Sequence, residues 1–229
     1  MKRIFLLLWG LPVFAALHAQ GGFGHFSIGV AQSTFGNLAR DLSVPSLMGS
    51  ASVKGSGTSI GGGGFGLVGK HLLLGGKGFA GAFGKSTGPN GTLQTGHGWG
   101  FFNVGYLKPI PSRWWGYFYG GFGGGGASAE LTNQSGSTWE FGGFQIKNGE
   151  KGSVGTGGMG FDAGVGAFRF LPSPAGGFMV GIQAGYCSGI GTQFWKNGSK
   201  QANNLAAWRP QMAYITLCIG GGGGSGFSR

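Results

Sequence analysis

Apolar side chains recur at every second position in several segments of this sequence, and glycine fills most of the positions between them. In GMGFDAGVGA (158–167) one alternate set is wholly apolar, and the other consists of glycines and Asp162. The same period runs through GGFMVGIQAGY (176–186). Successive side chains of a β-strand point to opposite faces, so a period of two residues predicts strands. Each strand has one apolar face and one face that is rich in glycine.

About eight segments of this kind follow one another along the chain. They are 22–31, 56–69, 72–84, 96–107, 114–130, 155–171, 176–187 and 208–220. Longer loops near 32–55, 85–95, 131–154 and 188–207 alternate with short turns at 70–71, 108–113 and 172–175. Outer-membrane barrels have short turns at one end and long loops at the other. The alternation predicts an all-β, antiparallel, up-and-down transmembrane β-barrel of about eight strands, with both chain ends on the short-turn side.

The first twenty residues have the layout of a secretory signal. Lys2 and Arg3 precede the apolar stretch 4–17, and Ala19 stands before Gln20. We expect residues 1–19 to be a signal peptide and residues 20–229 to be a single barrel domain. No later run of about 18 apolar residues free of charge indicates a membrane-spanning helix. The mature chain is therefore expected either to be secreted or to cross a membrane as strands.

The composition also points away from an ordinary soluble domain, because charged residues make up 9% of the chain against about 25% in such domains. The order of strands and loops resembles the small eight-stranded bacterial outer-membrane barrels over nearly the whole mature chain. The segments HFSIG, GGGGFG, GWGFFNVGYL, GGFGGGG and ITLCIGGGGG resemble an uncharacterised group of glycine-rich exported bacterial proteins. This resemblance implies a location in the bacterial outer membrane. One departure is that such barrels usually end on an aromatic residue, whereas Phe227 is followed by Ser228 and Arg229.

The segment GGGGFGLVGKH (61–71) fits most of a phosphate-binding loop. Because 57 of the 229 residues are glycine, a motif built mainly on glycine carries little weight. His71 also stands where such a loop needs a Ser or Thr hydroxyl for Mg²⁺. We instead expect a strand with Phe65 and Leu67 facing lipid, followed by a tight turn at Lys70 and His71.

Lys77 and Asp162 fall in the middle of predicted strands. A Lys facing lipid at the bilayer midplane costs about 2 to 4 kcal/mol, so we expect both side chains to point into the barrel. Two interpretations remain open: a polar path for a ligand or ion, or an internal ion pair with Asn103 and Gln183 that fills the lumen. The predicted lumen polar cluster consists of His25, Ser27, Lys77, Asn103, Asp162 and Gln183.

His25 and Ser27 share the inner face of the first predicted strand, which invites comparison with outer-membrane lipid hydrolases. An acyl-transfer site also needs an orienting acid and an oxyanion hole, and neither can be located in the sequence. We therefore predict no catalytic residues, no metal site and no cofactor. A lipid-modifying barrel enzyme remains an alternative.

Aromatic residues cluster directly after the turn at 108–113. Trp114, Trp115, Tyr117 and Tyr119 stand where an aromatic girdle at a membrane interface is expected. This segment therefore predicts the edge of the apolar band.

The formal net charge is +11, and many of the cations fall in the predicted outer loops. These are Arg40, Lys54, Lys85, Lys147, Lys151, Lys196 and Lys200, against Asp41, Glu140 and Glu150. Such loops suit the phosphates of an outer leaflet. We expect membrane lipid and lipopolysaccharide as partners, leave other outer-membrane or surface proteins open, and expect no nucleic acid because the chain is exported and its cations are dispersed.

The two cysteines are expected to stay unpaired. If the first strand runs outward, Cys187 lies near the outer end of the seventh strand and Cys218 lies near the opposite end of the eighth. A disulfide needs Cα atoms within about 7 Å, so this arrangement predicts two free thiols that face the lumen.

These observations predict a non-enzymatic integral outer-membrane β-barrel protein with a structural, surface-interaction or small-ligand-handling role. The second alternative, besides a barrel enzyme, is a glycine-rich secreted fibre or adhesin whose strands stack between chains.

Overall fold

The computed structural model describes residues 19–33, 55–141, 144–173, 175–191, 196–197, 200–201 and 209–227. Almost all of this part is strand, and the one helical element is the short 3₁₀ helix η1 (Ser225–Phe227). No helix within the described ranges is long and apolar enough to cross a membrane. The predicted signal peptide 1–19, apart from Ala19, and the loop 34–54 lie outside the described residues.

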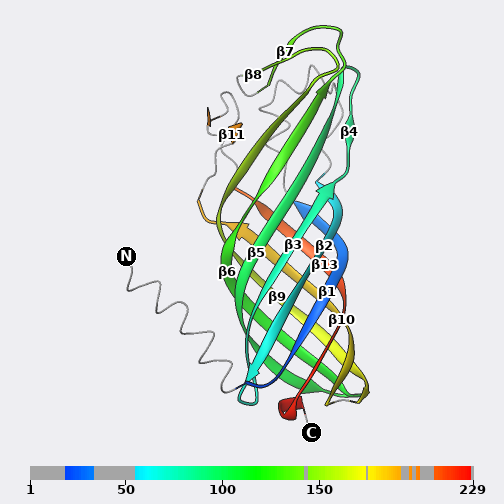
Figure 1. Cartoon of the computed structure of the whole chain (residues 1–229), viewed down its shortest axis with the longest axis vertical. Helices are drawn as coiled ribbons and strands as arrows, with labels where there is room; N and C mark the ends of the chain where they lie inside the picture. The colour runs from blue at the N-terminus through cyan, green and yellow to red at the C-terminus, as the bar shows by residue number, and fades with distance from the viewer. Residues whose placement is uncertain are drawn as a thin grey trace.

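Eight long strands form a closed ring (Figure 1). In ring order they are β1 (Ala19–Ser33), β2 (Ser56–Val68), β3 (Leu72–Phe83), β5 (Gly91–Ile110), β6 (Trp114–Asn133), β9 (Lys151–Ser173), β10 (Gly176–Gly189) and β13 (Gln211–Gly223). Every neighbouring pair is antiparallel, and β13 pairs with β1 to close the ring. The predicted up-and-down barrel of eight strands is confirmed.

Three strands continue past the ring and carry the remaining short strands. Beyond the ring, β6 pairs with both β5 and β9, and β5 also pairs with β4 (Ser86–Thr87). The hairpin β7 (Trp139–Phe141)–β8 (Phe144–Ile146) lies beyond them (Figure 1). We call 86–95, 129–154 and their strands the extension. The expected loops near 85–95 and 131–154 are thus partly strand, because pairs such as Leu93↔Leu131 continue the ladder.

The short turns lie together at one end of the ring. The turns at 69–71 and 111–113, and the connection between β9 and β10, lie at the end where β1 begins and β13 finishes, which we call the turn end (Figure 1). The extension lies at the other end, the loop end. There, β11 (Lys196–Asn197) pairs with β12 (Lys200–Gln201) and with β9. Most of the expected loop 188–207 lies outside the described residues.

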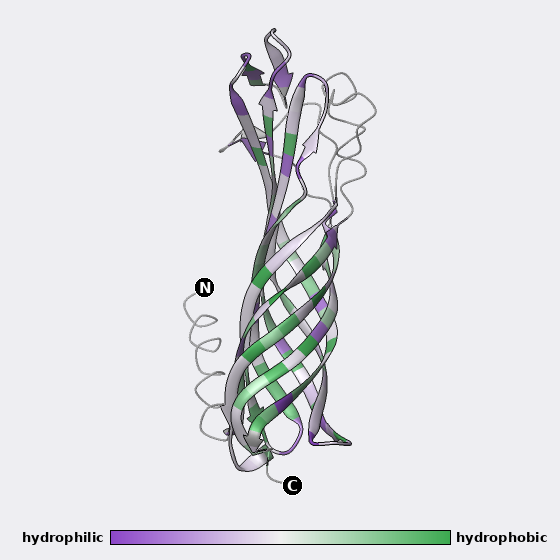
Figure 2. Cartoon of the chain, turned by 90° about the vertical axis from the view of Figure 1, so that its right-hand side faces the viewer, coloured by the Kyte–Doolittle hydropathy of each residue, from purple (hydrophilic) through white to green (hydrophobic). Residues whose placement is uncertain are grey.

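The outer and inner faces of the ring differ as expected for a membrane barrel. Phe26, Phe118 and Leu217 on the outside are each more than half exposed, and Figure 2 shows apolar residues repeating along the tilted strands of the wall. Soluble monomers rarely expose apolar patches larger than a few hundred Å². The predicted facing of the alternate residues in β1, β9, β10 and β13 is confirmed.

The facing predicted for β2 is wrong. Phe65 is 3% exposed and Leu67 is fully buried, so both point into the lumen while Gly64 and Gly66 face outward. Phe65 packs against Phe23 of β1, with ring centroids 5.4 Å apart. An eight-stranded lumen is just wide enough to be filled by side chains, and these two residues fill it at the turn end. Lys70 and His71 do lie in the β2–β3 turn, as predicted.

Both cysteines are free and buried, as the sequence predicts. Cys187 pairs with Met212 of β13, and Met212 lies six residues along that strand from Cys218. At about 3.3 Å per residue, this separation is on the order of 20 Å, which is too long for a disulfide.

Candidate functional site

A buried ion pair crosses the middle of the lumen. The Lys77 ammonium on β3 lies 2.7 Å from an Asp162 carboxylate oxygen on β9. Strands β5 and β6 separate β3 from β9 in the ring, so the two side chains reach across the interior. Both are almost fully shielded from solvent. The expectation that both side chains point inward agrees with this arrangement.

Two tyrosine hydroxyls complete the hydrogen bonds of this pair. Lys77 donates to Tyr119 Oη at 3.0 Å and to Tyr214 Oη. Tyr214 donates to the second Asp162 oxygen at 2.7 Å, and the two hydroxyls lie 2.7 Å apart. The Lys77 ammonium also lies 4.5 Å from the centroid of each tyrosine ring. We call Lys77, Tyr119, Asp162 and Tyr214 the central polar cluster. Buried charges require such hydrogen bonding, because water no longer solvates them.

All six residues of the predicted lumen polar cluster are buried inside the barrel, but they do not form one group. They are His25, Ser27, Lys77, Asn103, Asp162 and Gln183. Lys77 and Asp162 contact each other. Gln183 instead donates a hydrogen bond to Tyr117 Oη at 3.3 Å. Asn103 occupies the space beside Gly121, where a Cβ would lie 1.8 Å from the Asn103 amide oxygen. Among the described residues, no group of three or more His, Cys, Asp or Glu is placed to hold a metal ion.

The predicted aromatic girdle is wrong for three of its four members. Trp115, Tyr117 and Tyr119 are buried in the lumen, and only Trp114 is left partly exposed on the opposite face of β6. The reason lies on β9, where Gly166 and Gly164 are the register partners of Tyr117 and Tyr119. A Cβ on Gly164 would lie 2.3 Å from the Tyr119 hydroxyl, and one on Gly166 would lie 2.4 Å from the Tyr117 ring. Glycines on one strand therefore provide the space for tyrosines on the next.

Two residues of the central polar cluster were not assigned to the lumen cluster from the sequence. The sequence pattern assigns Tyr119 to the girdle and predicts no role for Tyr214. The period of β13 carries the signal for Tyr214, because this residue alternates with the apolar outer residues Ala213 and Ile215. The contact of Tyr214 with Lys77 depends on the closed ring.

Apolar clusters lie on both sides of the central polar cluster, and the loop-end cluster continues from the lumen into the core of the extension. The turn-end cluster consists of Phe23, Phe65, Leu67, Leu73, Leu107, Trp115, Tyr117, Tyr119, Phe168, Phe170, Met179, Cys218 and Phe227. The loop-end cluster consists of Ala31, Phe79, Phe83, Leu93, Trp99, Phe101, Ala127, Ala129, Leu131, Ile146, Val154, Cys187, Met212 and Tyr214. Tyr119 belongs to the first and Tyr214 to the second, so their touching hydroxyls join the two clusters.

The C-terminal segment closes the turn end. After β13 the chain turns into η1 beneath the ring (Figure 1), and Phe227 is fully buried. Its ring meets Trp115 and Phe170 edge-on, with centroids 5.3 and 5.1 Å away. The Gly224 amide donates to the Ala175 carbonyl in the β9–β10 turn at 3.1 Å. Phe227 therefore packs inside the barrel instead of ending the last strand.

A closed ring of eight strands, an apolar outer wall and a packed interior together decide the class of this protein. The chain is a small eight-stranded β-barrel of the outer-membrane type. The barrel matches no protein-family description, and no curated protein matches its sequence.

Several solved structures are similar to this barrel. The attachment invasion locus protein Ail of Yersinia pestis aligns with 14% identity and a TM-score of 0.45, covering 88% of this chain and 98% of Ail. Neisserial surface protein A aligns with 12% identity and a TM-score of 0.43, covering 89% and 96%. The outer membrane protein OprG of Pseudomonas aeruginosa aligns with 11% identity and a TM-score of 0.38, covering 90% and 96%.

Proposed function

We propose that this protein is a non-conducting, non-enzymatic barrel of the bacterial outer membrane that holds a surface-interaction platform, the extension, outside the cell. The observation that carries the proposal is the filled lumen. Two apolar clusters and the central polar cluster occupy the interior, and Phe227 covers the turn end. A solute path needs a continuous hydrated route through the interior, and this packing opposes one.

The surroundings of His25 and Ser27 support a non-enzymatic role. Both side chains are buried in the lumen, and the His25 ring lies 6.3 Å from the Phe23 ring. Neither His25 ring nitrogen has a hydrogen-bond partner among the described residues. Asp162 is already bound to Lys77 and Tyr214. Acyl transfer needs a serine, histidine and acid linked by hydrogen bonds, which this arrangement does not provide.

The extension is built as an ordered platform. Leu93, Leu131 and Ile146 are buried between its strands. Asn133 holds the segment that follows β6: its amide nitrogen donates to the Ser137 and Ile146 carbonyls at 2.7 and 2.8 Å. A chain that served only to anchor itself in a membrane has no evident need for an ordered structure beyond the ring.

The charges of the extension suit lipopolysaccharide as a partner. Lys147 and Lys151 of the extension are exposed, as is Lys85 directly before it, and Lys151 pairs with Glu130 at 2.8 Å. Cations at the loop end, next to the apolar wall, are placed for the phosphates of an outer leaflet. The cleaved signal peptide 1–19 is part of this proposal, because export is required for that location.

The fibre alternative is opposed by the closed ring. Each of the eight strands is paired on both sides within the membrane-spanning part, which leaves that part no edge for stacking between chains. A detergent extract that sediments as discrete particles, and a gel mobility that changes on boiling, are the results expected of a closed barrel.

The test is ion conduction in planar lipid bilayers. We expect purified, folded protein to insert without producing discrete current steps, whereas a general porin in the same membrane produces them. Folding is checked by the change in gel mobility on boiling. Reproducible current steps from the wild-type protein would overturn the proposal of a sealed barrel.

A further inference from the structure

At the loop end, one edge of β9 has few strand partners among the described residues. On one side β6 pairs with β9 from Lys151 to Phe168, whereas on the other side β10 pairs with it only from Gly160 onward. Between Lys151 and Gly158, the described residue that pairs with this second side is Lys196 of β11, opposite Gly155. Here β11 lies against β9 through a single residue pair, beyond the end of β10.

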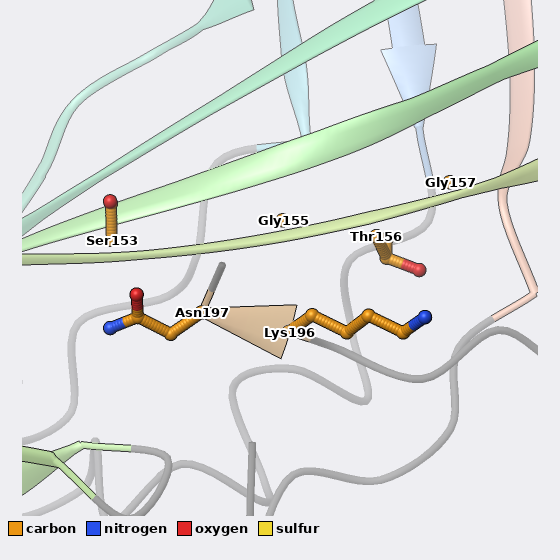
Figure 3. Close-up of a pocket in the computed structure, with 6 residues that line it drawn as sticks. All are labelled: Ser153, Gly155, Thr156, Gly157, Lys196 and Asn197. Carbon is orange, nitrogen blue, oxygen red and sulfur yellow. The ribbon is translucent and has the colours of Figure 1, made fainter. Parts of the chain in front are cut away.

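A pocket of about 450 Å³ lies between these two strands. It is lined by Ser153, Gly155, Thr156, Gly157, Lys196 and Asn197 (Figure 3). Figure 3 shows the Lys196 ammonium and the Thr156 hydroxyl extending in the same direction, with the Asn197 carboxamide and Ser153 at the other end. The volume falls within the range of about 300 to 1,000 Å³ that is typical of small-ligand sites.

The polar groups of the pocket favour an anion. Lys196 contributes an ammonium, Asn197 an amide NH₂ group, and Ser153 a hydroxyl, while no carboxylate is among the lining residues. No described carboxylate lies within ion-pair distance of Lys196, in contrast to Lys151, which pairs with Glu130 at 2.8 Å. Lys196 is thus a cation without a described acidic partner, beside a pocket of hydrogen-bond donors.

The glycines of the pocket leave room for a ligand ring. Gly155 and Gly157 present no side chain, so a ligand ring can lie against the backbone of β9. Hydroxyl and carboxamide groups suit the hydroxyls of a sugar, which both donate and accept hydrogen bonds. We propose that this pocket binds an oxyanion, a phosphate or a sulfate, carried on a saccharide. The proposal rests on the proposed function only in placing the loop end outside the cell.

Two sources can supply this chemistry: phosphorylated sugars of lipopolysaccharide in the same membrane, or a soluble sulfated polysaccharide. Gly155 lies four residues along β9 from Met159, which is an exposed apolar residue of the outer wall. This is about 13 Å at roughly 3.3 Å per residue, so the pocket lies just beyond the apolar band. A phosphorylated sugar of the outer leaflet is within reach.

The primary test is a titration of the full-length folded protein in detergent micelles with glucose 1-phosphate, followed by NMR shifts of the Gly155, Gly157 and Lys196 amides. Glucose is the neutral control ligand. We expect glucose 1-phosphate to bind at least about ten-fold more tightly than glucose, and Lys196→Gln to weaken binding about ten-fold. Lys85→Gln removes an equal charge elsewhere at the loop end and is expected to change the dissociation constant less than two-fold.

A second variant tests the pocket without changing its charge. A Cβ at Gly155 meets only the Ala127 carbonyl, at 3.7 Å, so Gly155→Leu is expected to fold and to fill the pocket. It should weaken glucose 1-phosphate binding by at least ten-fold. Equal affinities for the two ligands, or equal losses in Lys196→Gln and Lys85→Gln, would overturn the proposal. The conductance test of the sealed barrel is independent of either result.

Two further measurements distinguish the sources. Co-sedimentation with vesicles that contain lipopolysaccharide, and binding of dextran sulfate to protein in nanodiscs that lack it, are compared for the wild type and Lys196→Gln. A loss confined to the vesicles indicates the membrane sugar, and a loss confined to dextran sulfate indicates a soluble polymer. No loss in either overturns the site as a binder of macromolecular ligands.

Discussion

In the turn-end half of the lumen, aromatic side chains fill space left by glycines on neighbouring strands. The extension instead holds its shape by backbone pairing and a small apolar core. Tyr119 lies against Gly164, so a methyl group added at Gly164 would clash with the tyrosine. In the extension, the buried Asn133 side chain joins neighbouring backbone groups through hydrogen bonds. In the lumen, substitutions that add atoms are destabilising because the packing is close. In the extension, substitutions that remove hydrogen bonds cause a local loss of order.

The largest effect is expected for removing one charge of the central polar cluster. Asp162→Leu leaves the buried Lys77 ammonium without its carboxylate, and breaking a buried pair in this way costs about 3 to 5 kcal/mol. The double variant Lys77→Met with Asp162→Leu removes both charges and should regain most of the lost stability. Urea unfolding in lipid vesicles, followed by tryptophan fluorescence, measures both. Additive losses in the double variant would show that the two side chains do not interact.

A smaller loss, about 3 kcal/mol, is expected for Phe227→Ala, because truncating a buried phenylalanine leaves a cavity. The two free cysteines can report separately on the two apolar clusters. Cys218 lies in the same cluster as Phe227 and Cys187 lies in the other. Thiol labelling of the folded variant should become faster at Cys218 and stay unchanged at Cys187. Equal acceleration of labelling at both thiols would show that the effect of Phe227→Ala is not confined to the turn end.

Gly164→Ala is expected to cost about 1 to 3 kcal/mol, as overpacking typically does. The new methyl group would lie 2.3 Å from the Tyr119 hydroxyl and 2.5 Å from the Ala184 carbonyl oxygen. Gly100→Ala is the matched control, because a Cβ there faces outward and meets nothing within 4 Å. The fraction that keeps the unboiled gel mobility measures folding yield. Similar yields for the two variants would contradict the close packing of the lumen.

The smallest effect on the barrel is expected for Asn133→Ala. It removes the hydrogen bonds that the Asn133 side chain donates to the Ser137 and Ile146 carbonyls and accepts from the Ser135 amide and hydroxyl, a local loss of about 1 to 3 kcal/mol. Hydrogen exchange of the amides in 135–150 should accelerate while the gel mobility of the barrel stays unchanged. Asn148→Ala is the control, since its exposed side chain accepts one bond, from Gly136 at 3.1 Å. Unfolding of the whole barrel in Asn133→Ala would show that the two regions are not independent.

The sequence by itself determined the strand number, the positions of the short turns and the inward facing of Lys77 and Asp162. It did so because a strand with one apolar face has a single acceptable orientation at a membrane, and because a charge in hydrocarbon costs several kcal/mol. The free thiols followed from the same strand directions, since Cys187 and Cys218 lie too far apart along neighbouring strands.

Only the tertiary structure decided which way the aromatic residues of β2 and β6 face. A phenylalanine or tyrosine is acceptable in lipid, at the interface or in a packed lumen, so the alternation within its own strand leaves its direction open. For Tyr117 and Tyr119 the direction depends on Gly166 and Gly164, which stand about fifty residues away in the sequence. The ordered extension was likewise decided only by the tertiary structure. The pairing of β5 with β6 continues past the ring because the two strands match over their full length, and no residue in either strand marks where the membrane ends.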